Sequence, residues 1–145
     1  MQKNNREPLF RIDNIPLHLI LERKTKADRK MGLNLNVYRN AHYYTLNTLK
    51  KKFYERFKEQ IQESPLGPGP FSLQYSFFPS HTNCDLNNFI SIIDKFMSDV
   101  LVKVGLIKDD NVTVISETNH RFIKVDSKNP RVELTIYRFT GEAIL

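Results

Sequence analysis

"FSLQYSFFPSHTNCDLNNFISIIDKFMSDVLVKVG", residues 71–105, holds a strand pattern followed by a long helix pattern, and it decides the fold class. Over residues 71–78 every second side chain is apolar, which predicts a strand with one apolar face. From residue 86 the apolar spacing changes to three and four, which predicts a helix over residues 86–104 that Gly105 ends. The expected core residues are Phe71, Leu73, Tyr75 and Phe77 of the strand and Phe89, Ile93, Phe96, Met97, Val100, Leu101 and Val104 of the helix.

Upstream of this stretch, the periodicity predicts two strands and a second helix. Residues 17–23 and 32–38 have strand patterns, and a basic turn over residues 23–30 joins them. Residues 45–63 place apolar side chains three and four apart on one helical face, and "SPLGPGP", residues 64–70, ends this helix in a loop. The apolar positions are Leu46, Leu49, Phe53, Phe57 and Ile61.

Downstream, three further strands are expected. Residues 112–118 and 121–126 flank the Asn119–His120 pair, and residues 130–139 form a last strand with Val132, Leu134 and Ile136 on one side. The order is thus strands, helix, strand, helix and three strands. This order predicts one α+β domain over residues 1–145, with a mixed or antiparallel sheet packed by two main helices.

Composition limits the function classes. With 145 residues and a single cysteine, the chain can form no internal disulfide, and its Cys and His residues lack zinc spacing. No apolar run is long enough to span a membrane, and the N-terminus has no signal-peptide core. We expect a soluble protein in the reducing cytoplasm.

The charge balance favours a polyanionic partner. Lys and Arg number 22 against 16 Asp and Glu, which gives a formal charge of +6 and a pI near 9.5. Residues 23–30, "RKTKADRK", hold five of these cations, and "KKK", residues 50–52, begins the basic face of the second helix. Nucleic acid is the partner that this charge suggests, although such runs are also typical of ordinary solvated faces.

One candidate site surrounds the start of the long helix. Asp85 precedes the helix, Lys95 lies on its polar edge, and Asp109 and Asp110 follow it. In the functional interpretation, Asp85, Lys95 and one acid of the Asp109–Asp110 pair converge on a phosphodiester. Carboxylates would hold Mg²⁺, and the lysine would offset charge on the transition state.

A structural interpretation of the same residues stays open. Asp85 can be a helix N-cap, and Lys95 with Asp99 can be a surface pair one helical turn apart. Asp109, Asp110 and Asn111 can form an ordinary polar turn.

A family resemblance favours the functional interpretation. "DLNN" at residues 85–88, "DKFMSDVLVKVGLIKDDNV" at 94–112, "NPRVELTI" at 129–136 and "LNVYRNAHYYTLN" at 35–47 occur in this order and spacing. Together they resemble the RusA family of Holliday-junction resolvases, especially its phage and prophage members, over about residues 33–138. A DLDN motif opening a helix, a lysine within that helix and a later pair of aspartates are typical of the family.

The resemblance implies a magnesium-dependent endodeoxyribonuclease. It implies a RusA-like fold, a homodimer, Mg²⁺ with Mn²⁺ as a substitute, and branched DNA as the partner, cut by paired symmetric nicks during recombination and repair. The host would be a bacterial or phage-infected cell. By residue, it implies Asp85, Lys95 and Asp110 as catalytic residues and Asp85, Asn87, Asp109 and Asp110 as metal ligands.

Two departures from the family pattern bear on activity. Asn87 replaces an aspartate, and Lys95 matches the family lysine only if one helical turn is added after "DLNN". Asn87 offers a neutral amide oxygen, so the site loses one negative charge and binds hard cations more weakly. Asp94 or Asp99 would compensate in a working nuclease. The alternative is a branched-DNA-binding protein that keeps the fold without cutting.

The remaining expectations concern DNA contacts and aromatic residues. The residues expected to contact DNA are Lys24, Lys26, Arg29, Lys30, Arg39, His42 and Lys50. His42 has either a local structural role or one in proton transfer. His81 and His120 are expected in loops, and Phe77 and Phe78 are expected in core or dimer packing.

Overall fold

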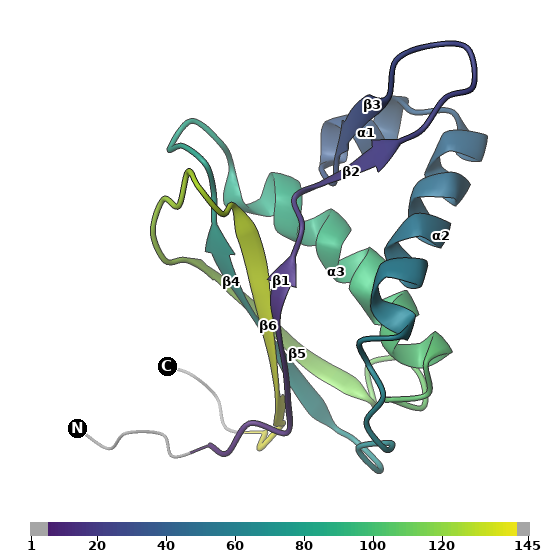
Figure 1. The fold of residues 1–145 in the computed structure, drawn as a ribbon. Helices are drawn as coiled ribbons and strands as arrows, with labels where there is room; N and C mark the ends of the chain where they lie inside the picture. The colour runs from purple at the N-terminus through teal and green to yellow at the C-terminus, as the bar shows by residue number, and fades with distance from the viewer. Residues whose placement is uncertain (1–5, 142–145) are drawn as a thin grey trace.

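The fold comes from a computed structural model that describes residues 6–141 (Figure 1). Strands and helices alternate unevenly along the chain, with three strands first and two at the end. The elements are β1 (Phe10–Ile15), β2 (His18–Leu21), β3 (Arg29–Gly32), α1 (Leu35–Asn40), α2 (Tyr43–Lys58), β4 (Phe71–Phe78), α3 (Leu86–Lys103), β5 (Ile115–Phe122) and β6 (Arg131–Arg138).

Four strands form a mixed sheet in the order β1-β6-β4-β5, and β2 pairs with β3 in a separate hairpin. Strands β4 and β5 are parallel, so the chain must cross between them, and α3 makes this crossover. The other pairings are antiparallel. The predicted α+β class with a mixed sheet is therefore confirmed.

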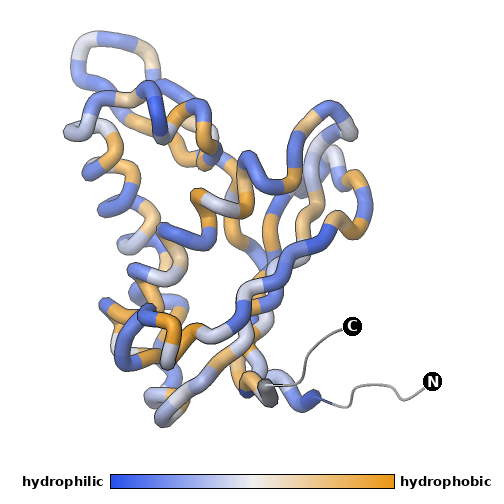
Figure 2. The backbone as a smooth tube through the Cα atoms, turned by 180° about the vertical axis from the view of Figure 1, so that it is seen from behind, coloured by the Kyte–Doolittle hydropathy of each residue, from blue (hydrophilic) through white to orange (hydrophobic). Residues whose placement is uncertain are grey.

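The core follows the predicted periodicity closely. The strand face of Phe71, Leu73, Tyr75 and Phe77 is buried beneath α3, and α2 packs beside α3 through the edge contact of Phe53 with Phe96. Of the predicted apolar stripe of α3, Phe89 and Val104 are half-buried and the rest is buried. Hydrophobic and hydrophilic colours alternate along both long helices in Figure 2, because each helix turns one side toward this core. Phe77 and Phe78 are both buried, as core packing requires.

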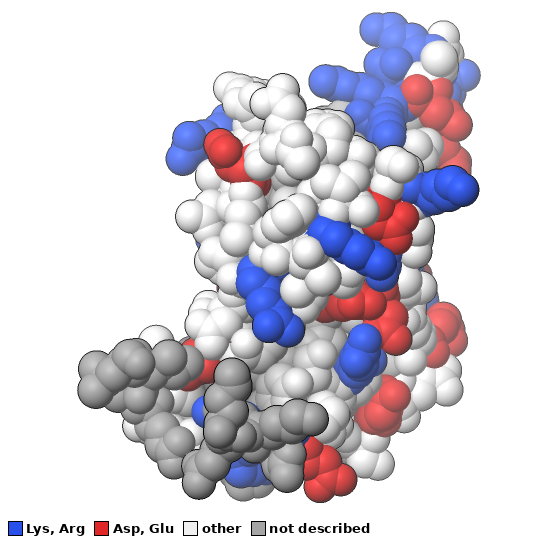
Figure 3. Space-filling view, turned by 90° about the vertical axis from the view of Figure 1, so that its left-hand side faces the viewer, with Lys and Arg blue, Asp and Glu red and all other residues white. Residues whose placement is uncertain are grey.

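The basic turn lies at one end of the molecule. The β2–β3 hairpin forms the top of Figure 1, and Lys and Arg gather there in Figure 3. The turn itself is shorter than predicted, because Arg29 and Lys30 belong to β3, where they pair with Leu21 and Ile20.

The predicted strand over residues 32–38 is wrong, because residues 35–40 form the short helix α1. The Asn34 side chain accepts a hydrogen bond from the Val37 amide at 2.9 Å and so caps this helix. The alternation of Leu33, Leu35 and Val37 is too short to distinguish a strand from one helical turn.

Two predictions about the sheet also need correction. The strands predicted on either side of Asn119 and His120 are one strand, β5, because backbone pairing with β4 continues through Gln74 and Tyr75 opposite them. His120 is therefore a strand residue and not a loop residue. The sequence reasoning also missed β1, whose pattern is broken by a register shift between Ile12 and Ile15.

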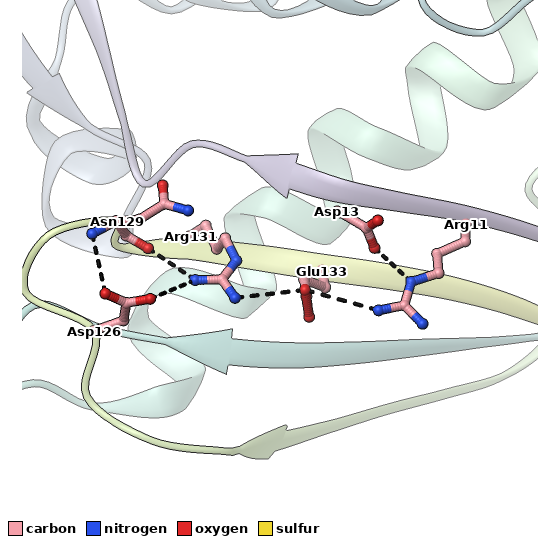
Figure 4. Close-up of polar contacts among 6 residues, drawn as sticks. All are labelled: Arg11, Asp13, Asp126, Asn129, Arg131 and Glu133. Atoms are coloured by element: carbon pink, nitrogen blue, oxygen red, sulfur yellow. Dashed lines mark hydrogen bonds and ion pairs between the residues drawn. The ribbon is translucent and has the colours of Figure 1, made fainter.

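The sheet face away from α3 is polar. Glu117 accepts hydrogen bonds from Ser72 at 2.9 Å and from Asn119 at 2.7 Å. Farther along this face, Arg131 contacts Asp126 at 2.9 Å, and a chain of ion pairs continues through Glu133 to Arg11 and Asp13 (Figure 4). Many side chains of this face thus pair with one another, and the apolar side of the sheet is covered by the helices.

Candidate functional site

A cavity of about 370 Å³ lies where α3 meets α1, α2 and β5. Side chains of both charges line this cavity. Three carboxylates, Asp94, Asp99 and Asp110, line it together with Lys50 and Lys95. Tyr38, Ser98, Ile115 and Thr118 complete its wall. We call this the first cavity.

Asp94 is the most enclosed carboxylate of the first cavity. Its Oδ1 accepts a hydrogen bond of 2.6 Å from the buried Tyr75 hydroxyl and a longer one, 3.4 Å, from Ser98. Burial raises the pKa of Asp94, and these hydrogen bonds with the charges of Lys95 and His120 offset only part of the rise. Asp94 is thus a fixed carboxyl group with raised proton affinity, a property typical of functional sites.

Lys95 lines the first cavity from α3. Its ammonium lies 5.9 Å from the centre of the Tyr38 ring. The ion pairs found within residues 6–141 do not join it to Asp99, so the surface pair that the spacing allows is not formed. The charge of Lys95 is therefore available to an anion in the cavity.

A second cavity of about 600 Å³ lies at the N-terminal end of α3. Asp85 and Asn87 line it from α3, Arg39 from α1 and His120 from β5. Asp85 is at the N-cap position, but its side chain makes no capping hydrogen bond. Its exposed carboxylate is therefore free to face a ligand, which removes the main support for a purely structural interpretation of this residue.

Asn88 has a structural role instead. Its side-chain oxygen accepts a hydrogen bond of 3.1 Å from the Leu35 amide at the start of α1. The second half of the "DLNN" motif thus fixes α1, which carries Tyr38 to the first cavity and Arg39 to the second.

The structure does not bring the predicted site residues into one place. Asp85 and Lys95 are ten residues apart on α3, which corresponds to about 15 Å along the helix axis. Asp85 and Asn87 line the second cavity, whereas Lys95 and Asp110 line the first. Both cavities lie between α1 and α3, since Tyr38 and Arg39 of α1 line one cavity each.

Asp109 serves the turn that follows α3. Its carboxylate accepts hydrogen bonds from the Asp110 amide at 2.7 Å and from the Asn111 side chain at 2.8 Å. Asp109 thus has the turn role of the structural interpretation, and Asp110 is the acid that reaches a cavity. Among residues 6–141, no three His, Cys, Asp or Glu side chains are close enough to hold a metal ion.

The predicted DNA-contact residues are distributed over four places. Lys24 and Lys26 lie in the hairpin turn and Arg29 and Lys30 on β3, all of them exposed. Arg39 lines the second cavity and Lys50 the first. His42 is the N-cap of α2, where its Nδ1 accepts a hydrogen bond of 3.3 Å from the Tyr44 amide, so it has the local role.

Sequence reasoning missed three residues that shape the site. The sequence pattern predicts Tyr75 only as a core residue and His120 as a loop residue, and it does not point to Ser98. The spacing of Asp94 and Ser98 by one helical turn was available from the sequence. The hydrogen bond of Tyr75 with Asp94 and the nearness of the His120 charge were not, because they depend on how β4 and β5 lie against α3.

Comparison with known proteins adds no relative: no family model matches the chain, and a search of curated proteins finds no significant match. None of the helices formed by residues 6–141 is long and apolar enough to cross a membrane.

Proposed function

We propose that the chain is a magnesium-dependent endodeoxyribonuclease that resolves four-way DNA junctions by paired symmetric nicks during recombination and repair. The observation that carries the proposal is the first cavity, in which Lys50 and Lys95 lie beside three carboxylates, Asp94, Asp99 and Asp110. Lysines bind the phosphate of a scissile bond, and carboxylates bind the cation or the proton that hydrolysis requires.

Individual roles follow from the contacts. Lys95 offsets the charge that develops on the phosphate oxygens, since no ion pair within residues 6–141 occupies it. Asp94, which Tyr75 and Ser98 hold in place, accepts a proton from the attacking water. Lys50 and Arg39 bind phosphates on either side of the cut.

The donor chemistry of these residues suits Mg²⁺. This ion prefers oxygen ligands and commonly uses one or two carboxylates together with water and substrate phosphate. Asp99 and Asp110 of the first cavity are such a pair, and Asp85 with the Asn87 amide is another in the second. A bound ion, with Mn²⁺ as a substitute, would activate water and stabilise the leaving oxygen.

The separation of the two pairs along α3 bears on the expected homodimer. Within one chain, Asp85 cannot join Asp110 unless the structure rearranges, since they line different cavities. We propose that a second copy, with its α3 antiparallel to that of the first, brings its Asp85 to the Asp110 of the first copy. We propose that the active species is such a dimer, which also provides the two sites that paired nicking requires.

The decisive experiment incubates the protein with a synthetic four-way junction and Mg²⁺. We expect symmetric nicks from the natural chain and loss of nicking in Asp110→Asn, with junction binding retained in chelator. Asp109→Asn is the matched control, because that carboxylate is occupied within the turn. Normal cutting by Asp110→Asn would show that the proposed site is wrong.

A second function is supported by Asn87. A junction-binding protein that no longer cuts would result if the missing carboxylate has weakened the metal site too far. In that case the natural chain binds the junction without nicking it, and Asn87→Asp restores cutting.

A further inference from the structure

A third groove, of about 560 Å³, lies between α2 and β2 and belongs to neither cavity described above. Its α2 wall carries Lys51, Lys52 and Arg56, and its β2 wall carries Leu19 and Ile20. Ile20 is 49% exposed, so the groove has an accessible apolar surface next to three cations.

The groove is electropositive. Its one carboxylate, Glu55, is in an ion pair with Lys58 at 2.6 Å, which leaves the charges of Lys51, Lys52 and Arg56 uncompensated within the groove. The hairpin whose β2 strand forms the other wall adds the exposed cations of residues 23–30. This combination fits a phosphate backbone.

Three aromatic rings lie together at the start of α2. The rings of His42 and Tyr44 stack with centroids 5.0 Å apart at 17°, and the centroids of Tyr43 and Tyr44 are 4.1 Å apart. Tyr43 is 57% exposed and Tyr44 66%. The cluster therefore offers aromatic faces to solvent, although large aromatic side chains are usually buried.

The aromatic cluster and the groove lie along one stripe of α2. The Thr48 hydroxyl, which lines the groove, donates a hydrogen bond of 2.9 Å to the Tyr44 carbonyl one turn earlier. Tyr44, Thr48, Lys52 and Arg56 follow at intervals of four residues and so share a helical face. The backbone of Tyr44 lies about 6 Å from that of Thr48 along the axis of α2, toward the N-terminal end of the helix.

We infer that this stripe binds an unpaired strand of DNA, with Lys51, Lys52 and Arg56 on its phosphates and one base stacked on the cluster of His42, Tyr43 and Tyr44. Base faces are accessible in a single strand but covered in a duplex, and aromatic platforms beside cationic grooves are the usual way to bind them. The inference rests on the proposed function, in which the strand is the segment opened at the branch point.

The test measures binding of fluorescently labelled oligothymidylate in chelator, by anisotropy. We expect Tyr43→Ala/Tyr44→Ala to weaken binding about 5- to 150-fold, the range for loss of stacking on one base, and Tyr43→Phe/Tyr44→Phe to retain it. Equal affinities of the natural chain and the double alanine variant, or tighter binding of a blunt duplex than of the single strand, would overturn the inference.

The cations are tested through salt dependence. Lys51→Gln and Arg56→Gln should each lower the slope of log affinity against log salt by about 0.7, the value for one phosphate contact of a single strand. Lys128→Gln, in the loop between β5 and β6, is the matched control and should leave the slope unchanged. Equal slopes in all variants would overturn the inference.

Both measurements are independent of cutting. If oligothymidylate binding depends on the aromatic cluster while the four-way junction is never nicked, the nuclease proposal fails and the strand site stands. If the junction is nicked but the alanine variant binds oligothymidylate normally, the strand site fails and the nuclease proposal stands.

Discussion

Asp94 illustrates, for a single residue, how surroundings change the chemistry of a carboxyl group. Asp94 and Asp99 both line the first cavity, yet Asp99 is exposed and Asp94 lies against the buried Tyr75. Burial disfavours the charged form, so the pKa of Asp94 rises despite a short hydrogen bond that favours that form. The raised pKa of Asp94 thus comes from its surroundings in the fold and not from the residue type.

The raised pKa of Asp94 predicts a specific effect on stability. Between the unfolded value near 3.9 and the raised folded value, the folded state binds more protons, so this residue's contribution to stability falls as pH rises. Asp94→Asn removes that contribution and keeps an oxygen that accepts from Tyr75. We expect the variant to lose less stability than the natural chain as the pH rises from about 4 through the folded pKa of Asp94.

Urea unfolding at each pH measures this difference. Asp99→Asn, at an exposed position of the same helix, is the control for the exchange of an aspartate for an asparagine. A pH dependence of Asp94→Asn identical to that of the natural chain would contradict the prediction.

Among the elements, α1 shows how a short helix depends on its neighbours. Six residues are too few to form a stable isolated helix. Side-chain oxygens from outside the helix accept hydrogen bonds from its first amides: Asn34 binds Val37, and Asn88 of α3 binds Leu35. The position of α1, and with it that of Tyr38 and Arg39, therefore depends on α3.

We predict that Asn88→Ala destabilises the chain by about 1–3 kcal/mol, because the part-buried Leu35 amide loses its partner. Hydrogen exchange at Leu35 should accelerate more than the exchange of amides in the middle of α3. Asn87→Ala is the matched control, since the Asn87 side chain is exposed and only its backbone carbonyl accepts a hydrogen bond, from Ser91. Equal destabilisation by the two substitutions would argue against this role of Asn88.

For the whole molecule, the position of Asp85 and Asp110 in different cavities leaves two possible arrangements of the sites in the proposed dimer. If each site combines Asp85 of one copy with Asp110 of the other, a heterodimer of Asp85→Asn and Asp110→Asn chains contains one intact site and one site with both substitutions. If each site lies within one chain, both sites of the heterodimer are damaged.

We therefore predict that mixing and refolding the two inactive variants restores single nicks on a four-way junction. About half of the dimers should be heterodimers, and each should cut one strand and not two. Asp85→Asn mixed with itself is the control. No recovery of nicking in the mixture, when mass measurement confirms heterodimers, would place each site within a single chain.

Much of the fold was predictable because its core elements carry strong local patterns. The apolar faces of β4, α3 and β6 lie where the periodicity put them, and Gly105 ends the helix region with a φ of 81°. Three elements are not predicted correctly. The pattern of α1 is too short to assign a period, and that of β1 is interrupted by a register shift. The continuity of β5 depends on its pairing with β4. The sequence predicts which residues of the candidate site carry suitable charges. It does not predict that these residues line two different cavities.

The sequence alone determined the α+β class, the apolar faces, the excess of cations and the polar residues of α3, because each depends on composition or on spacing within one element. Only the tertiary structure decided that Asp85 and Lys95 line different cavities, that Tyr75 and His120 lie near Asp94, and that β2 lies beside the cations of α2 to form a groove. These relations depend on the packing of α1, α2 and β5 around α3. Such packing brings together residues that are far apart in the chain. The spacing of apolar residues within one element contains no information about these contacts.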